Sequence, residues 1–316
     1  MAIGINPTVD FAFKRMLGSS EHSNVTIHFL NSILGGRPLI TEIQFLNTVL
    51  EKDSESDKTS VLDILAVDEH GRRVNIEIQT SLPAGLPQRL IYYTSCIYVG
   101  QLKEGARHTE LRPAIGICVL TRPLFRELPD LHLDFRLRET SGAIFTDDLQ
   151  IHLLELSKLK VTAQDVYHAT PIERWAYFLR NAEQLNVDEI TRLFPDREIA
   201  EAAGVLEMIS QTPDQRWLYN ARLKAQLDAA ARIELASGEA RKEGHQEGHQ
   251  EGLQVGLQVG RQEGLQRGEL IGRIKLCREF LVAPPLTREE LEELGLLDLS
   301  QLNEQVESLQ QQLRTR

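Results

Sequence analysis

The stretch VLDILAVDEHGRRVNIEIQTS, residues 61–81, has the pattern of two strands joined by a turn, and it carries acids where apolar residues would make safer strands. Successive side chains of a strand point to opposite faces of the sheet, so Glu77 shares a face with Gln79, and Asp63 shares one with every second residue after it. The loop between the two strands therefore decides whether the carboxylates of Asp63 and Glu77 meet.

Two loop lengths are compatible with this stretch. A four-residue loop from Asp68 to Gly71 would put Glu77 on the opposite side of the sheet from Asp63. A five-residue loop from Asp68 to Arg72, with Gly71 in a left-handed conformation, would place residue 63 opposite residue 77. Only the second register brings the two carboxylates together.

Two carboxylates directly opposite each other destabilise a sheet, and a divalent cation removes that repulsion. Mg²⁺ prefers carboxylate oxygens, retains several waters and binds phosphates, so the pair suits the hydrolysis of a phosphodiester. The alternative is that each acid caps the end of a strand or pairs with Arg72, Arg73 or Arg89. The residues alone leave these two interpretations open.

Composition indicates an ordinary soluble chain of 316 residues that stays in the cytoplasm, with a net charge of -11. That charge speaks against a protein that simply coats nucleic acid. The three cysteines are far apart and form no CxxC pair, so the sequence implies neither a zinc knuckle nor a disulfide framework. No signal peptide and no uninterrupted apolar run of membrane-spanning length is present.

The chain up to residue 160 alternates between helical and strand patterns, which predicts an α/β domain. We expect helices over 8–34 (with a break at 18–20) and 89–102, strands over 40–50, 112–121, 131–138 and 149–156, and a charged loop over 51–60. Residues 161–236 have a helical pattern throughout and are expected to form a helical domain. Pro284 and Pro285 break the chain before Thr287 and Glu290, whose spacing predicts a capping box and a helical tail over 282–316.

Glycine recurs at every fourth position from Gly244 to Gly272. Each glycine inside a helix costs about 1 kcal/mol relative to alanine, so the segment is either unstructured or a helix whose bare stripe lets another backbone approach closely. Leucines and valines alongside the glycines favour the helix. We therefore expect residues 237–281 to form a glycine-striped helix that makes a homo-oligomer, a dimer in the simplest case.

The spacing D(63)-x13-E(77)-x-Q(79) resembles the PD-(D/E)XK nuclease signature in its E-x-Q form. NPTVDFAFKRMLG (6–18), YYTSCIYVGQLKEGARHTELRPAIGICVL (92–120) and IHLLELSKLK (151–160) resemble the PD-(D/E)XK nuclease family transposases, the recombination-promoting nucleases, as does the glycine-stepped extension. The resemblance implies a restriction-endonuclease-like core over 1–160, a mixed central sheet flanked by helices, followed by an all-α C-terminal region.

The resemblance also implies roles for particular residues. Asp63, Glu77 and the backbone carbonyl of Ile78 would hold Mg²⁺ or Mn²⁺. Asp10 is a further candidate for the metal shell. Gln79 stands where many relatives of the wider superfamily have lysine; its amide cannot act as a base, but it could orient a water.

Three more residues are implied as contacts to the substrate. Lys14, one helical turn after Asp10, would supply positive charge to a phosphate. Gln88 and Tyr92 share one face of their helix and resemble the Q-x-x-x-Y element of RecB-like nucleases, where they would hold the substrate backbone or support Glu77. Structural roles for Asp10, Lys14 and Tyr92 are the alternative.

The resulting hypothesis is a metal-dependent DNA endonuclease that promotes recombination or acts on foreign DNA, as in phage defence. The rival hypothesis is a catalytically inactive DNA-binding or scaffold protein that works through its C-terminal oligomerising helix. The missing lysine and the acidic net charge favour the rival, whereas the intact Asp63, Glu77 and Gln79 oppose it.

Overall fold

The computed structural model describes residues 1–35, 39–48 and 62–315, and the chain divides into two compact units, Met1–Glu234 and Leu235–Arg316. The predicted loop over 51–60 lies outside the described residues. The strands are β1 (Ile43–Phe45), β2 (Ile64–Asp68), β3 (Arg73–Gln79), β4 (Ala114–Leu120), β5 (His132–Arg138) and β6 (Ile144–Glu155). The helices are α1 (Asp10–Leu17), α2 (Ser23–Leu34), α3 (Leu86–Val99), α4 (Pro171–Asn181), α5 (Val187–Leu193), α6 (Arg197–Gln211), α7 (Pro213–Phe280), α8 (Arg288–Leu296) and α9 (Leu299–Arg314).

The first unit is built on a mixed six-stranded sheet in the order β1-β2-β3-β4-β6-β5. Strands β3, β4 and β6 are parallel to one another, while β1, β2 and β5 pair antiparallel with their neighbours. Every residue of β4 is buried, as its continuous apolar run predicts. The expected α/β core, a mixed central sheet flanked by helices and followed by a helical region, is confirmed.

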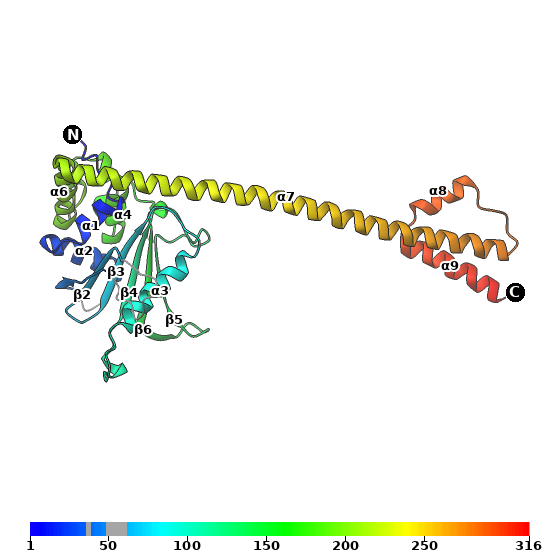
Figure 1. The fold of residues 1–316 in the computed structure, drawn as a ribbon, viewed down its shortest axis with the longest axis horizontal. Coiled ribbons are helices and arrows are strands. Elements are labelled where there is room, and N and C mark those ends of the chain that lie inside the picture. The colour runs from blue at the N-terminus through cyan, green and yellow to red at the C-terminus, as the bar shows by residue number, and fades with distance from the viewer. Residues whose placement is uncertain (36–38, 49–61, 316) are drawn as a thin grey trace. The chain divides into compact units, whose positions relative to one another are not determined.

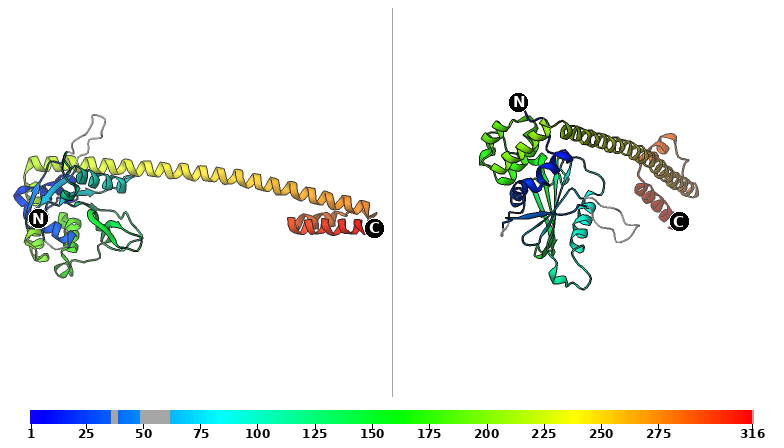
Figure 2. Two further views of the ribbon diagram at one scale, coloured as in Figure 1. Left: turned by 90° about the horizontal axis from the view of Figure 1, so that it is seen from below. Right: turned by 60° about the vertical axis from the view of Figure 1, so that its left-hand side comes forward.

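The two faces of the sheet are covered by different helices, and α1 and α2 lie across the sheet from α3 (Figures 1 and 2). On one face, Leu86 and Leu90 of α3 pack with Cys118 of β4. On the other face, strand residues such as Ile76 pack with Phe13 of α1 in the large core. Glu77 alternates with Ile76 along β3 and therefore points to the α3 side of the sheet.

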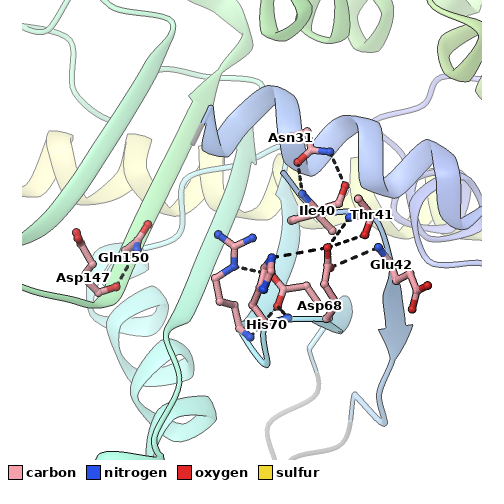
Figure 3. A network of polar contacts seen from close by, with 10 residues as sticks. Asn31, Ile40, Thr41, Glu42, Asp68, His70, Asp147 and Gln150 are labelled. Atoms are coloured by element: carbon pink, nitrogen blue, oxygen red, sulfur yellow. Dashed lines mark hydrogen bonds and ion pairs between the residues drawn. The ribbon is translucent and has the colours of Figure 1, made fainter. Parts of the chain in front are cut away.

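The turn between β2 and β3 has the longer of the two lengths considered above. Val67 pairs with Arg73, and Gly71 has φ +78, the left-handed conformation that favours glycine. The buried carboxylate of Asp68 accepts hydrogen bonds from the backbone N–H of His70 and of Arg72, both at 2.9 Å, and pairs with the Arg72 guanidinium (Figure 3). Asp68 thus fixes the loop length, and with it the register of the hairpin.

The same network secures the edge of the sheet. The side-chain amide of Asn31 in α2 donates to the carbonyl of Ile40 and accepts from its N–H, both at 2.9 Å (Figure 3). Glu69 accepts hydrogen bonds from the backbone N–H and the hydroxyl of Thr41, both at 2.8 Å. Glu69 therefore holds the hairpin to the segment that leads into β1, while Asp68 orders the turn itself.

The helices after residue 160 share the large core with the sheet. Trp175 and Phe178 of α4 and Leu206 of α6 are fully buried in the same cluster as Ile76 and Ile117 of the sheet. The structural unit therefore runs to Glu234, past the boundary at residue 160 that the change in sequence pattern suggests. The reason is that α6 packs against α1 and α2, and α4 against α2, so these helices continue the same core.

The second unit contains the glycine repeat and the tail. All the glycines from Gly244 to Gly272 lie in α7, and a Cβ atom added at any of them would meet no described atom within 4 Å. The tail is helical as predicted, and Thr287 and Glu290 form the capping box of α8. Ile274 of α7 packs with Leu294, Leu302 and Val306 of the two tail helices. In the described part of the chain, no helix combines the length and the apolar character needed to cross a membrane.

Candidate functional site

Asp63 is the residue immediately before β2, so its cross-strand neighbour follows from the register of the hairpin. Leu65 pairs with Asn75 and Ile64 with Ile76, so extending the ladder by one residue places Asp63 opposite Glu77. Cross-strand partners of this kind point to one face, with Cβ atoms about 5 Å apart. The structure thus adopts the one register of the two that brings the carboxylates together.

Asp63 contacts the first helix as well as β3. Its Oδ1 lies 2.9 Å from Nζ of Lys14, and its Oδ2 accepts a hydrogen bond of 3.3 Å from the N–H of Ile78. Burial raises the pKa of the Asp63 carboxyl, and the positive charge of Lys14 opposes that rise without cancelling it. The folded protein therefore holds Asp63 in a setting that disfavours its negative charge.

Glu77 is more deeply buried, with 3 % of its surface exposed. One carboxylate oxygen accepts a hydrogen bond of 3.0 Å from the side-chain amide of Asn75, and the other lies 3.7 Å from the guanidinium of Arg89. Burial raises the pKa of Glu77, and the nearby charge of Asp63 raises it further, against the opposing effects of Asn75 and Arg89. The two acids thus act on each other electrostatically in an environment poor in water.

Lys14 connects two of the acids. Its Nζ lies 2.9 Å from Oδ1 of Asp10 and 2.9 Å from Oδ1 of Asp63. Burial would lower the pKa of Lys14, but the two carboxylates outweigh burial and the net shift is upward. Asp10, Lys14 and Asp63 are therefore one contiguous group, although Lys14 and Asp63 are 49 positions apart in the chain.

A cavity of about 300 Å³ opens beside this group. Its walls come from Asp10 of α1, from Ile78 and the residues that follow it, and from one face of α7. The lining residues are Asp10, Ile78, Gln79, Thr80, Ser81, Arg222, Ala225, Gln226 and Ala229. Gln79 thus faces a space in which a substrate or a water could sit.

The donors present fit a divalent cation. Among the residues that the structure describes, no three His, Cys, Asp or Glu side chains are grouped so as to hold a metal ion. Mg²⁺ needs fewer, because it keeps several waters and accepts one or two carboxylates with phosphate oxygens. A strand residue's carbonyl points to the same side as its N–H, so the Ile78 carbonyl faces the side on which Asp63 accepts a hydrogen bond. Asp63, Glu77 and this carbonyl all offer oxygen atoms, the ligands that Mg²⁺ prefers. Each of the two carboxylates also lies next to a positive side chain, Lys14 for Asp63 and Arg89 for Glu77.

The helix after the hairpin presents a different residue to the site than the spacing argument predicts. Gln88 is exposed and Tyr92 is half exposed, whereas Arg89 is the α3 side chain that contacts Glu77. The guanidinium of Arg89 also lies 5.8 Å from the centre of the Tyr93 ring. A substrate contact for Gln88 and Tyr92 remains a prediction, while the pairing of Glu77 with Arg89 matches the alternative interpretation.

No curated protein and no solved structure matches the chain. The family model described as PD-(D/E)XK nuclease family transposase matches residues 7–236, a segment that contains all six strands and every acid of the site. This is the family that the E-x-Q signature and its flanking segments predict, and it supports a nuclease type of function. The chain therefore belongs to the PD-(D/E)XK nuclease family transposases.

Proposed function

We propose that this protein is a metal-dependent DNA endonuclease that hydrolyses phosphodiester bonds at Asp63 and Glu77. The observation that supports the proposal most is the hairpin register, which, continued by one residue beyond Ile64, places the partly exposed Asp63 opposite the buried Glu77. Carboxylates removed from water lower the stability of the folded state, so a role in binding would explain why Asp63 and Glu77 are present.

The chain's own groups divide the work as follows. Asp63, Glu77 and the Ile78 carbonyl would hold Mg²⁺ or Mn²⁺, and Asp10 is close enough to Lys14 and Asp63 to complete the shell. A divalent cation bound there would polarise the scissile phosphate and lower the pKa of a water. Gln79 faces the cavity and would orient the attacking water through its amide.

Lys14 has a separate role in this proposal. Its single ammonium pairs with both Asp10 and Asp63 and so offsets part of their negative charge. The flexible four-carbon stem of lysine would let it turn from Asp63 toward a phosphate oxygen when substrate binds. Lys14 would then stabilise charge that develops on the phosphate.

Cleavage of supercoiled plasmid tests the function. We expect the full chain to nick or linearise the plasmid with Mg²⁺ or Mn²⁺ and to be inert with EDTA. Asp63→Ala and Glu77→Ala should each abolish cleavage, while the control Asp147→Ala removes an acid that pairs with Arg136 on the exposed β5–β6 ladder and should cleave normally. An inert wild type, or cleavage by Asp63→Ala at the wild-type rate, would contradict the proposal.

One observation favours the scaffold hypothesis instead. Asp63 and Glu77 each have a cationic partner, which a purely structural pair would also have. A scaffold would bind DNA, or another copy of itself, equally well with Asp63→Ala and with or without a divalent cation. The plasmid assay separates the two hypotheses, because a scaffold has no cleavage to lose.

The C-terminal region would make the enzyme a homodimer through residues 237–281. Support comes from α7, whose glycine stripe carries no described neighbour and whose leucines and valines beside the stripe are exposed. Two sites in one dimer could act on both strands of a duplex, and repair of the cut ends would promote recombination or remove foreign DNA. Light scattering of the full chain and of a chain truncated at Ser237 measures the mass; an unchanged number of subunits would rule out this pairing role.

A further inference from the structure

We propose that Arg222, on the first part of α7, binds a backbone phosphate of DNA next to the scissile one, and that α7 is therefore part of the substrate site. This inference rests on the proposed nuclease function, because it extends the same site. It concerns a residue far from the E-x-Q signature, on a helix whose other end carries the glycine stripe.

The start of α7 is fixed against the first unit. Tyr219 has 3 % of its surface exposed, and its hydroxyl accepts a hydrogen bond of 2.9 Å from the N–H of Asn6. Leu223 packs against the large core. These anchors, four residues apart, set the rotation of the helix. They leave the neighbouring face, with Arg222 and Gln226, to line the cavity beside Gln79.

The cavity has the chemistry of a phosphate subsite. Thr80 and Ser81 carry hydroxyl groups, Gln79 and Gln226 carry amides, and Arg222 carries the positive charge. A guanidinium matches the oxygens of a phosphate with two parallel hydrogen bonds. About 300 Å³ is at the small end of ligand sites, which suits one unit of a strand that passes through rather than an enclosed molecule.

The guanidinium of Arg222 is free of acid partners in the part of the first unit that the structure describes. Asp10 lines the same cavity, but its carboxylate pairs with Lys14 at 2.9 Å. Within the described ranges, Arg222 makes no ion pair with any acid. Arg222 is exposed and lies on a helix face that lines the same cavity as Gln79, so it is placed to attract an anionic substrate.

DNA binding by the full chain tests the role. The probe is a fluorescent duplex oligonucleotide, kept intact with Ca²⁺ in place of Mg²⁺ and checked on a gel, and its anisotropy is followed between low and moderate salt. Arg222→Gln should weaken binding about tenfold, because it removes a charged donor pair that matches the phosphate oxygens. The slope of log K against log salt should fall by about 1. Lys224→Gln is the matched control, because it removes one positive charge two residues away from an exposed position that does not line the cavity.

Two further readouts separate a phosphate contact from a structural effect. Arg222→Lys should keep the salt slope but lose part of the affinity, because an ammonium retains the charge without the planar fork. In cleavage with Mg²⁺, Arg222→Gln should raise KM more than it lowers kcat. Equal affinity and equal salt slope for Arg222→Gln and Lys224→Gln would overturn the inference, as would a wild type that does not bind the duplex at low salt.

The outcomes also distinguish this inference from the proposed function. If the wild type cleaves DNA and Arg222→Gln behaves like Lys224→Gln, the inference is wrong and the nuclease proposal stands. If Arg222→Gln shows the loss of affinity and slope but the wild type never cleaves, the phosphate contact stands and the nuclease proposal is wrong.

Discussion

The hairpin register makes a direct prediction for Asp68, whose side chain is completely buried at the β2–β3 turn. Asp68→Ala removes the acceptor for two backbone N–H groups and the partner of the Arg72 guanidinium. Breaking a buried ion pair by removing one partner costs about 3–5 kcal/mol. Arg72 keeps 20 % of its side chain exposed and can reach water, so we expect the free energy of unfolding of the first unit to fall by about 2–4 kcal/mol.

Urea unfolding followed by tryptophan fluorescence measures this change, because Trp175 is fully buried in the first unit. Asp68→Asn should lose less than Asp68→Ala, since the amide oxygen can still accept one backbone hydrogen bond. The control is Asp147→Ala, whose carboxylate pairs with Arg136 but is 56 % exposed, and surface pairs contribute about 0–1 kcal/mol.

The same substitution tests the link from the turn to the site. A slip of one residue in the register would move Asp63 to the opposite face from Glu77. We therefore expect Asp68→Ala to lose DNA cleavage at temperatures where the protein is still folded. A loss of stability no larger than that of Asp147→Ala, together with unchanged cleavage, would refute the reasoning that Asp68 sets the register.

Three further predictions concern single residues of the first unit. Gly116→Ala would place a Cβ atom 2.6 Å from the Thr94 hydroxyl and should lower the free energy of unfolding by about 1–3 kcal/mol, and Thr94→Ala in the same chain should restore part of the loss in urea unfolding. Arg89→Ala leaves Glu77 buried without its guanidinium, so stability should fall by about 1–2 kcal/mol, and a double-mutant cycle with Glu77→Gln should show that the effect depends on the carboxylate. Burial acts to raise the pKa of Glu69, but hydrogen bonds from its own backbone and from Thr41 outweigh it and lower the pKa from 4.5 to about 2. Because the folded pKa is depressed, Glu69 stabilises the fold above pH 4.5 and loses this effect as the pH falls toward 2, so urea midpoints of wild type and Glu69→Gln should converge at pH 2.

Local sequence signals were sufficient to predict most of the first unit. Glycine at position 71 and the alternation of apolar residues on both sides of it allow the register that the structure has, and the apolar run over 112–121 predicts the central strand β4. The first residue of α3 was harder to predict from the sequence. That helix begins at Leu86 rather than at residue 89, because Gly85 with φ +75 precedes it and Pro87 stands in its first turn.

The orientation of α3 at the site could not be predicted from the spacing of its polar residues. The spacing of Gln88 and Tyr92 places them on one helix face but does not say which face meets the sheet. That choice is made by Leu86, Leu90 and Ile97, which pack on the sheet and turn Arg89 toward Glu77. The apolar positions of α3 therefore indicate which face of the helix meets the sheet, whereas Gln88 and Tyr92 do not.

No local sequence pattern predicts that Arg222 lines the same cavity as Gln79. Arg222 lies 145 positions after Glu77, in a segment whose pattern only predicts a helix. Its place beside Gln79 follows from the packing of Tyr219 and Leu223 against the first unit. The extent of the family match, which ends at residue 236, agrees with a structural unit that includes this part of α7.

The energetics of the two acids bear on why they are retained. Burial raises the pKa of both Asp63 and Glu77, so keeping them charged makes the fold less stable. Lys14 and Arg89 offset this cost only in part. Apolar residues of similar volume often stabilise a fold as much as a buried ion pair does, or more. Val or Ile at positions 63 and 77 would suit the strands and release both cations. This cost is a reason to test the proposed role of the two acids, and the plasmid assay with Asp63→Ala measures the cleavage that the proposal requires.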